Sequence, residues 1–306
     1  MSRRSTFARS GFVRTLCLVA GGALVLAGCT SNTENESSGG ATSTVSIDVV
    51  KVDEIAVQLP DRVKGANKVV VGVNTPYQPN EFKDPSGKIV GFDVDLMNAV
   101  TAVLGVTPVY TESDFDKIIP AIQAGTYDLG MSSFTDTKER EQSVDFVTYF
   151  NAGIQWAQPA GGSVDPNNAC GLRVAVQTTT IEDTDEIPAK SAACVAAGKP
   201  PIQKIKFDRQ DDATTALVLG KVDAMSADSP VTAYAIKQSN GKLAPAGEVF
   251  DSAPYGWAVA KGSPLGPVLQ LAVQHLIDDG TYQKIAENWG VQAGTIQQSV
   301  INGAVS

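Results

Sequence analysis

The chain has 306 residues, of which 43% are hydrophobic and 19% are charged, and its formal net charge is −9. This length and apolar content are typical of a globular protein of one large or two smaller domains. The acidic balance and the lack of a basic patch in the sequence argue against nucleic acid as a partner.

The first 28 residues differ from the rest of the chain. Four arginines (Arg3, Arg4, Arg9 and Arg14) precede an apolar run at residues 16–26. The run is too short to span a membrane comfortably and matches the hydrophobic region of a signal peptide. We therefore predict that residues 1–28 are a signal peptide, and removal of its four positive charges would take the formal charge from −9 to −13.

The predicted signal peptide ends in Leu-Ala-Gly followed by Cys29, which resembles the lipobox of bacterial lipoproteins. The resemblance implies cleavage before Cys29 and lipidation of its thiol and new amino group, and several acyl chains anchor a protein stably. The alternative is an ordinary signal peptide that leaves Cys29 unmodified. Residues 30–44 are polar and small, so we expect residues 29–48 to form a lipidated cysteine and a disordered tether.

Two cysteines, Cys170 and Cys194, remain in the folded part. An exported protein matures in an oxidising compartment, so we expect a disulfide between them, the alternative being two separately buried thiols. The single histidine, His275, lies in an apolar helical run far from either cysteine in sequence. Neither cysteine is therefore expected to be catalytic.

From residue 68 onward, short apolar runs alternate with amphipathic stretches. Strands are predicted at residues 68–73, 106–110 and 127–132. Helices are predicted at residues 52–63, from Asp93 as the capping residue, and at residues 115–124. The helix after Asp93 has its apolar side chains at Val94, Met97, Val100, Val103 and Leu104. This alternation indicates βαβ units with a mainly parallel sheet, where ligands bind at the carboxyl ends of the strands.

Residues 130–146 read as the end of a strand, a polar turn and the first turn of a helix. Thr135 or Asp136 would open this helix, with Glu139 completing a capping box. Ser133 and Thr135 supply hydroxyl groups and Arg140 supplies a guanidinium, which together can hold a planar carboxylate. The alternative interpretation places Arg140 among acidic neighbours on a solvated helix face.

A Gly/Pro-rich stretch at residues 159–166 suits a connection between two lobes. A second alternating series then follows. Its strands are predicted at residues 172–176, 202–207 and 222–226, and its helices from residue 180, at 211–219 and from 230. The tail contains a strand at 255–260 and helices at 265–278 and 282–289. Two α/β halves are therefore expected.

The run from Met131 to Arg140, Met-Ser-Ser-Phe-Thr-Asp-Thr-Lys-Glu-Arg, resembles the ligand-binding segment of the periplasmic amino-acid-binding proteins of ABC importers. The likeness extends over residues 68–290. It implies a type II periplasmic binding fold of class α/β, with two lobes joined by a hinge of two strands near residues 154–158 and 253–259. It divides the chain into lobe 1 (residues 49–157 plus 254–306) and lobe 2 (residues 158–253).

The resemblance also implies roles for particular residues. Ser133, Thr135 and Arg140 would hold the ligand carboxylate from lobe 1. Thr179 and Thr180 would approach it from lobe 2, with Thr178-Thr179-Thr180 in place of the family's Gly-Thr-Thr, although a plain helix cap is the alternative for these threonines. A β-carbon at Thr178 could narrow that approach.

Asp228 matches the aspartate that binds the ligand ammonium group, or it caps the helix after it. The resemblance pairs Tyr77 and Phe115 as aromatic walls for the ligand stem, although either could be ordinary core. Binders of cationic amino acids often carry an aspartate where this chain has Asn74, so we expect a neutral polar or acidic α-amino acid as the ligand.

We therefore expect a monomeric, lipid-anchored receptor on the extracytoplasmic face of the membrane, without a cofactor or metal, that delivers an amino acid to an ABC permease. Two alternatives remain open. One is a receptor that binds a modified amino acid for signalling, and the other is a dehydratase-type enzyme on the same fold. An enzyme needs an acid or base in its cleft, and the motifs place no carboxylate there beyond Asp228.

Overall fold

A computed structural model describes residues 48–305 of the chain, which lie in one compact unit. The predicted signal peptide, Cys29 and nearly all of the predicted tether lie outside the described residues. Within the described part, no helix is long and apolar enough to cross a membrane.

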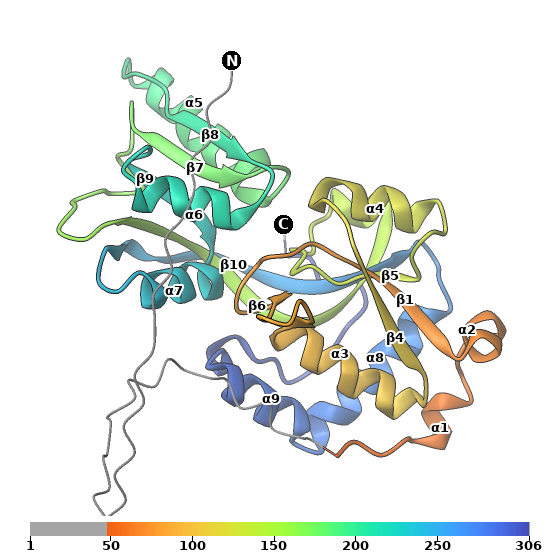
Figure 1. Cartoon of the computed structure of the whole chain (residues 1–306). Helices are drawn as coiled ribbons and strands as arrows, with labels where there is room; N and C mark the ends of the chain where they lie inside the picture. The colour runs from red at the N-terminus through yellow and green to blue at the C-terminus, as the bar shows by residue number, and fades with distance from the viewer. Residues whose placement is uncertain (1–47, 306) are drawn as a thin grey trace, which may run out of the picture. The chain divides into compact units, whose positions relative to one another are not determined.

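The first half of the fold is a three-layer α/β arrangement (Figure 1). Its elements up to the first crossing are α1 (Asp53–Ala56), α2 (Asp61–Ala66), β1 (Lys68–Val73), β2 (Phe82–Lys83), β3 (Ile89–Val90), α3 (Phe92–Leu104), β4 (Thr107–Glu112), α4 (Phe115–Gln123), β5 (Leu129–Gly130) and the 3₁₀ turn η1 (Arg140–Gln142). The C-terminal elements α8 (Leu265–Asp278), α9 (Thr281–Trp289) and the 3₁₀ turn η3 (Gln292–Gly294) return to this half. The tail therefore packs against the first half.

The core of the first half explains its strand sequence. Helix α3 packs against α8 and α9, while α4 packs against β5 and β10. Both faces of β1 are thereby covered, and a strand buried on both faces reads as a continuous apolar run. The five apolar positions predicted for α3 are all buried in one hydrophobic cluster.

The predicted capping role of Asp93 is wrong. Helix α3 begins after Gly91, which has φ 141° and whose added β-carbon would collide with the carbonyl oxygen of Asn80. Asp93 lies one residue inside the helix, fully buried, and accepts a 2.6 Å hydrogen bond from the Tyr149 hydroxyl. The helix start is thus set by close backbone packing that only glycine allows.

The second half repeats the α/β pattern. Its elements are β7 (Arg173–Gln177), the π-helical turn η2 (Glu182–Glu186), α5 (Ile187–Ala196), β8 (Gln203–Phe207), α6 (Gln210–Val218), β9 (Ala224–Asp228) and α7 (Ser229–Gln238). Two hydrophobic clusters lie on opposite faces of β7 and β9, one under α5 and the other under α6. The predicted disulfide between Cys170 and Cys194 is present and joins the segment before β7 to α5.

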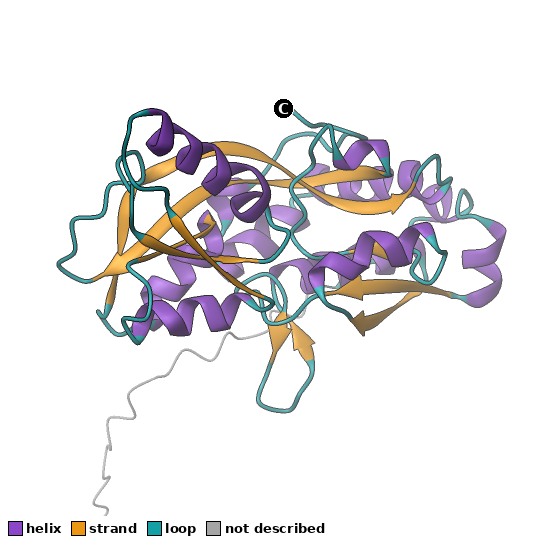
Figure 2. Cartoon of the chain, turned by 90° about the horizontal axis from the view of Figure 1, so that it is seen from above, coloured by secondary structure: helices purple, strands orange, loops and turns teal. Residues whose placement is uncertain are grey.

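Two long antiparallel strands, β6 (Val144–Pro159) and β10 (Leu243–Ala260), run from one half into the other (Figures 1 and 2). The strand order is β4-β1-β5-β10-β6-β9-β7-β8, with parallel pairs at both ends and antiparallel pairs around the crossing. On β6, residues Ile154–Ala157 already pair with β9 of the second half. The crossing therefore lies just before Ile154, and the Gly/Pro-rich stretch at 159–166 lies within the second half. The lobe boundaries given above stay predictions.

The predicted helix after Thr135 does not form. Ser133 adopts a left-handed backbone conformation with φ 51°, Thr135 forms an isolated bridge with Tyr255, and η1 has no side-chain cap. The backbone N–H of Asp136 donates to the carbonyl oxygen of Pro254 on β10 at 2.8 Å. Pairing with the crossing strand thus takes the place of the expected capping box.

Candidate functional site

A narrow cavity with about 10 Å³ of free space lies at the carboxyl ends of the strands and is lined by side chains of both halves. Its lining residues are Asn74, Tyr77, Phe115, Ser132, Ser133, Thr135, Arg140, Gln177, Thr180, Ile181, Glu182 and Asp228. This set contains eight of the nine predicted ligand-binding residues. Only Thr179 is absent, and it lines the neighbouring groove.

Strand ends place several of these residues. Asn74 follows β1, Ser132 and Ser133 follow β5, Gln177 ends β7 and Asp228 ends β9. Because parallel strands end on the same side of a sheet, residues far apart in the sequence meet there. The amide of Asn74 illustrates this, since it donates to the Ser113 carbonyl oxygen and accepts from the Gln177 side chain, both at 2.9 Å.

The guanidinium of Arg140 lies between the two halves. It donates to the Thr135 carbonyl oxygen at 2.9 Å and to the Thr179 carbonyl oxygen of the second half at 3.0 Å. It also lies over the rings of Phe115 and Phe134, which stack with centroids 4.5 Å apart. Burial lowers the pKa of Arg140, and the negative charge of Asp228 works against this shift. A buried guanidinium with open donor positions is suited to bidentate contact with a carboxylate.

Asp228 lies across the cavity from the first-half residues and accepts a short hydrogen bond from the Tyr77 hydroxyl. It occupies the N-cap position of α7 but makes no side-chain cap hydrogen bond, so its carboxylate is directed to the cavity rather than to the helix. Burial raises the pKa of Asp228 to about 6. A half-buried carboxylate of this kind binds a cationic group favourably because it gains a charge partner.

The threonine run differs from the expected register. The left-handed conformation that favours glycine falls at Thr179, with φ 64°, and not at Thr178. The Thr179 backbone N–H donates to Asp183 at 2.8 Å, while its buried hydroxyl has no hydrogen-bond partner among the described residues. Thr180 does line the cavity, and its hydroxyl donates to the Gln177 carbonyl oxygen at 2.9 Å. The left-handed conformation therefore falls at the middle threonine of the run.

Sequence reasoning missed four cavity residues, which are Ser132, Gln177, Ile181 and Glu182. Among them only Glu182, at the start of the π-helical turn after the threonine run, adds a charge. Glu182 is almost fully buried, and its Oε1 atom has no hydrogen-bond partner among the described residues. Burial, followed by the charge of Asp228, raises the pKa of Glu182 to about 8. The signal that could have identified Glu182 is an acidic residue at the start of a helix that faces the cleft.

A second carboxyl pair lies beneath the cavity. Glu81 and Asp93 are both fully buried and lie within 3.5 Å of the Ser133 hydroxyl, which also accepts a 2.8 Å hydrogen bond from Asn80. Burial raises the pKa of Glu81 well above its usual range and that of Asp93 to about 7. These groups hold Ser133, which has the left-handed backbone conformation, through contacts to its hydroxyl group.

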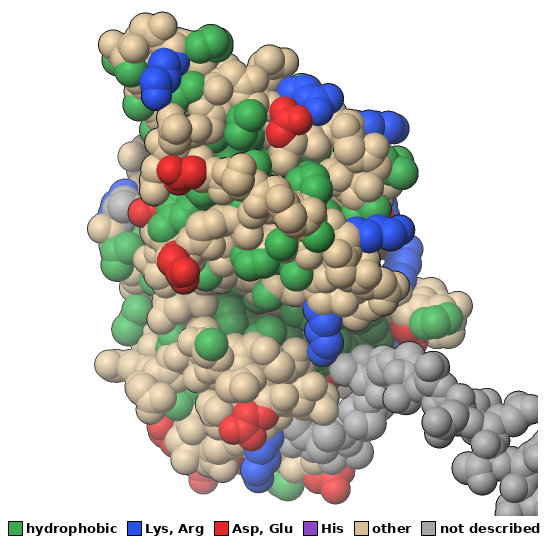
Figure 3. Space-filling model, turned by 90° about the vertical axis from the view of Figure 1, so that its left-hand side faces the viewer, with side chains coloured by type: hydrophobic (Ala, Val, Ile, Leu, Met, Phe, Trp, Pro, Cys, Tyr) green, Lys and Arg blue, Asp and Glu red, His purple; other side chains and the backbone are tan. Residues whose placement is uncertain are grey.

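The surface that Figure 3 presents carries Lys and Arg side chains interspersed with acidic, polar and hydrophobic ones, without a gathering of either charge. The charged groups considered so far are instead concentrated inside the cavity, where one arginine and two carboxylic acids meet.

Two α/β halves, a pair of crossing strands and a cavity with opposed arginine and aspartate define an amino-acid-binding protein of the type II periplasmic binding fold. The chain belongs to the bacterial extracellular solute-binding proteins, family 3, whose model matches residues 69–292. Over 302 residues it is 40% identical to the arginine-binding protein ArgT of Corynebacterium glutamicum, covering 98% of this chain and 96% of that protein. It is 32% identical to the L-arginine-binding protein of Pseudomonas aeruginosa, covering 72% and 87% of the two chains.

Solved structures of amino-acid-binding proteins are also similar to this chain. An ancestral arginine-binding protein bound to arginine has a TM-score of 0.67 and 36% identity, covering 73% of this chain and 98% of its own. The ancestral amino-acid-binding protein AncCDT-1, a precursor of cyclohexadienyl dehydratase, has a TM-score of 0.65 and 31% identity. The match covers 75% of this chain and 98% of AncCDT-1. Both curated relatives are named as binding proteins.

Proposed function

We propose that this protein captures a cationic α-amino acid, with arginine as the first ligand to test, and delivers it to an ABC import permease. The single observation that carries the ligand class is the charge of the cavity. Arg140 contributes one positive charge, and Asp228 and Glu182 contribute two negative charges when ionised. A ligand with one carboxylate and two cationic groups would neutralise this set, which a neutral or acidic amino acid cannot do.

This proposal revises our expectation of a neutral or acidic ligand, which rested on Asn74. The Asn74 amide is engaged with Ser113 and Gln177, so a different residue can supply the additional negative charge. Glu182 has that charge, is buried and has a free carboxylate oxygen among the described residues. Two relatives named for arginine support the same ligand class.

In the proposed complex, Arg140 and the hydroxyls of Ser133 and Thr135 hold the ligand carboxylate, while Asp228 holds the ammonium group. Tyr77 and Phe115 would flank the stem. Thr180 would add contacts from the second half, and Thr179 acts through its backbone carbonyl on Arg140. Because these groups are divided between the halves, the ligand stabilises the closed arrangement by contacts that the open one lacks.

Delivery requires export and a membrane location, which we propose are provided by the signal peptide and by lipidation at Cys29. The protein would then present its ligand to the permease as a monomer on the extracytoplasmic face. Mass spectrometry of the mature protein tests this part, because a diacylated or triacylated N-terminal Cys29 is expected. An unmodified cysteine or a mature terminus at another residue would contradict the anchor.

A binding experiment tests the ligand. We expect arginine to bind to the folded part of the protein, residues 46–306, in calorimetric titration, and Glu182→Gln to weaken arginine binding on the order of 10- to 100-fold because a buried charge pair is lost. Glutamine binding should change little. Asp185→Asn is the matched control, because it removes the same charge from an exposed side chain of the same turn. Equal arginine affinity in wild type and Glu182→Gln would contradict the proposed ligand class.

A dehydratase-type enzyme is the second candidate function, because the cavity contains a candidate proton donor. The cavity does contain a carboxyl group besides Asp228, since Glu182 has a raised pKa of about 8 and could exchange a proton. AncCDT-1 shows that a similar structure can precede a dehydratase. Product analysis after incubation with cyclohexadienyl acids separates the two functions, because a pure binding protein returns the compound unchanged.

A further inference from the structure

The C-terminal segment Ser299–Ala304 lies beside the first residues of β6. The Thr148 backbone N–H donates to the Val300 carbonyl oxygen, the Asn302 N–H donates to the Phe146 carbonyl oxygen, both at 2.9 Å, and Ile301 forms a bridge with Val147. The other edge of β6 is paired with β10. The segment thus adds an extended strand to the edge of β6 that β10 leaves open, and it lies beyond residue 292, where the match to the family model ends.

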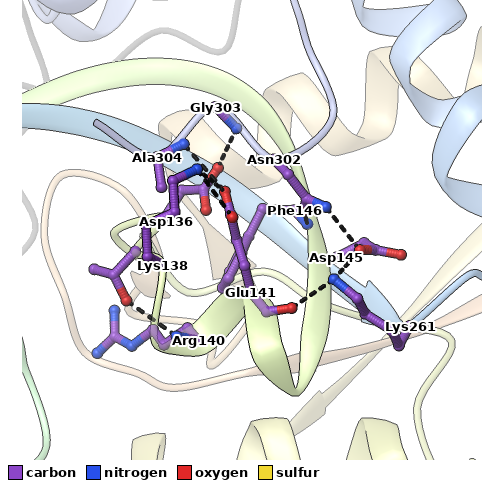
Figure 4. A network of polar contacts seen from close by, with 11 residues as sticks. Asp136, Lys138, Arg140, Glu141, Asp145, Phe146, Lys261, Asn302, Gly303 and Ala304 are labelled. Atoms are coloured by element: carbon purple, nitrogen blue, oxygen red, sulfur yellow. Dashed lines mark hydrogen bonds and ion pairs between the residues drawn. The ribbon is translucent and has the colours of Figure 1, made fainter. Parts of the chain in front are cut away.

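The end of this segment binds two acidic side chains of the loop that carries Arg140. The Gly303 N–H donates to Asp136 Oδ2 at 2.7 Å, and the Ala304 N–H donates to Glu141 Oε1 at 3.2 Å. Figure 4 shows the two carboxyl groups directed toward each other and toward these backbone N–H groups. Asp136 is only 1% exposed, and its second oxygen has no hydrogen-bond partner among the described residues.

The backbone of Asp136 is also held by strand β10, on the side away from the C-terminal segment. Its N–H donates to the Pro254 carbonyl oxygen of β10 at 2.8 Å, and the carbonyl oxygen of the preceding residue, Thr135, accepts the 2.9 Å hydrogen bond from Arg140. The peptide between Thr135 and Asp136 therefore orients the guanidinium. A movement of the Asp136 side chain would be transmitted to Arg140 through one peptide unit.

We propose that residues 299–304 form a C-terminal latch, which positions Arg140 for the ligand by binding the Asp136 and Glu141 carboxyl groups through the Gly303 and Ala304 backbone N–H groups. The role of Arg140 toward a ligand rests on the proposed function. The ordering of the loop by the latch does not depend on it, since the latch contacts involve only groups of the chain itself.

The ionisable groups around Asp136 determine how its contact with Glu141 and the latch depends on pH. The groups that face Asp136 are Glu141 and Lys138 of the same loop, with Lys138 Nζ 3.1 Å from the nearer Glu141 carboxylate oxygen. Beyond them, Asp145 on β6 is paired with Lys261 at 2.8 Å and accepts from Asn302, while the Lys261 ammonium also contacts the Glu141 backbone carbonyl. Residues 299–305 contribute no ionisable side chain. Burial, with the charge of Glu141, raises the pKa of Asp136 to about 7.

The sign of the pH effect follows from this raised pKa. Below pH 7 Asp136 is protonated and can donate to Glu141, so the pair is stable. As the pH rises through 7 Asp136 gains a negative charge beside Glu141, whose carboxylate already pairs with Lys138. The latch should therefore weaken with rising pH.

Three variants test the latch. Asp136→Ala removes the acceptor and Asp136→Asn mimics the protonated acid. Glu139→Gln is the matched control, because it removes an acid from an exposed side chain of the same loop that is not bound to the latch among the described residues. Hydrogen exchange of residues 133–143 is measured in the ligand-free protein. Arginine affinity is measured at about pH 6 and about pH 9, on either side of the raised pKa, and thermal melts confirm folding.

We expect Asp136→Ala to accelerate exchange across residues 133–143 and to weaken arginine binding roughly tenfold, as for loss of one hydrogen bond to a charged group. Asp136→Asn should match the wild type at the lower pH and bind more tightly than the wild type at the higher pH. All other titrating groups are the same in both proteins, so a change with pH in the ratio of their arginine affinities reports the titration of Asp136 alone. The control should behave as the wild type in exchange and in binding.

Unchanged exchange in Asp136→Ala would overturn the proposal, as would an Asp136→Asn affinity that stays in a constant ratio to the wild type between the two pH values. If Asp136→Ala fails to fold, the ratio of Asp136→Asn to wild-type arginine affinity at the two pH values decides whether the proposal holds. If the wild-type protein binds no amino acid, the proposed function fails by itself, and the exchange measurement on Asp136→Asn at both pH values still decides whether the latch exists.

Discussion

Glu182 and Asp228 show how burial prepares single side chains for a charged ligand. Both carboxyl groups lose solvation in the cavity, and the charge of Asp228 further disfavours ionisation of Glu182. In the ligand-free protein the cavity should therefore retain protons near neutral pH. A cationic ligand replaces them, so ligand binding and proton release are coupled.

This coupling predicts the pH dependence of arginine binding. The pKa is raised to about 8 for Glu182 and to about 6 for Asp228, so both acids bind protons that a cationic ligand must displace. In the Asp136→Asn protein, whose latch no longer titrates at this position, affinity should rise from about pH 6 to about pH 8 and level off above, with proton uptake by the buffer in calorimetry. In Glu182→Gln the rise should be confined to the region near the pKa of Asp228. An affinity that falls with pH over this range would be inconsistent with ionised acids at the site.

At the scale of elements, the second half depends on small cores. Its two hydrophobic clusters are separate and lie on opposite faces of the β7–β9 sheet, whereas the first half has one large continuous cluster. Cys194 on α5 is part of one small cluster and Cys170 packs against it. The disulfide therefore ties the strand that leads to the threonine run to the helix that follows it.

Replacing both cysteines should destabilise the protein. The bond closes a segment with a sequence separation of 24, and the loss of such a cross-link costs roughly 3 kcal/mol in the chain-entropy model. We expect Cys170→Ser together with Cys194→Ser to lower the free energy of unfolding in urea by this amount while arginine affinity changes little. Reduced wild-type protein is the control and should match the variant. An unchanged unfolding curve would show that packing alone maintains this region.

At the scale of the whole molecule, side-chain hydrogen bonds join the halves across the cleft in the described part of the chain. They include Tyr77 to Asp228, Asn74 to Gln177, and Arg140 to the Thr179 carbonyl oxygen. Each uses a polar group that lines the cavity or adjoins it. A ligand that replaces these contacts with stronger ones would shift the population toward the closed arrangement.

Closure can be measured by small-angle X-ray scattering. We expect arginine to reduce the radius of gyration of the wild-type protein, because the ligand is bound by groups of both halves. Asp228→Ala should abolish the change, since it leaves the ligand ammonium without its partner. Arg173→Ala, which breaks a pair with Asp223 away from the cleft, is the control and should respond as the wild type. Identical scattering of wild-type protein with and without arginine would exclude ligand-driven closure.

The sequence by itself determined the elements whose signals are local. The periodic apolar residues of α3, the apolar run of β1 and the helix at residues 265–278 all formed as predicted, because each depends on neighbours within a few residues. The disulfide followed from composition and compartment. Eight of nine predicted ligand-binding residues line one cavity, because the alternating strands bring their carboxyl ends together. Their contacts with a ligand stay predictions.

Only the tertiary structure decided where long-range contacts override local preference. Residues 133–143 carry a helix-start signal, yet their backbone and side-chain groups are used by Pro254 and by the C-terminal segment. Strand β10 extends back to Leu243 because β6 is available as its partner. Glu182 became a cavity residue through the turn after Thr180. In each case the deciding partner lies far away in sequence or depends on which side of an element faces the cleft, and local patterns contain neither kind of information.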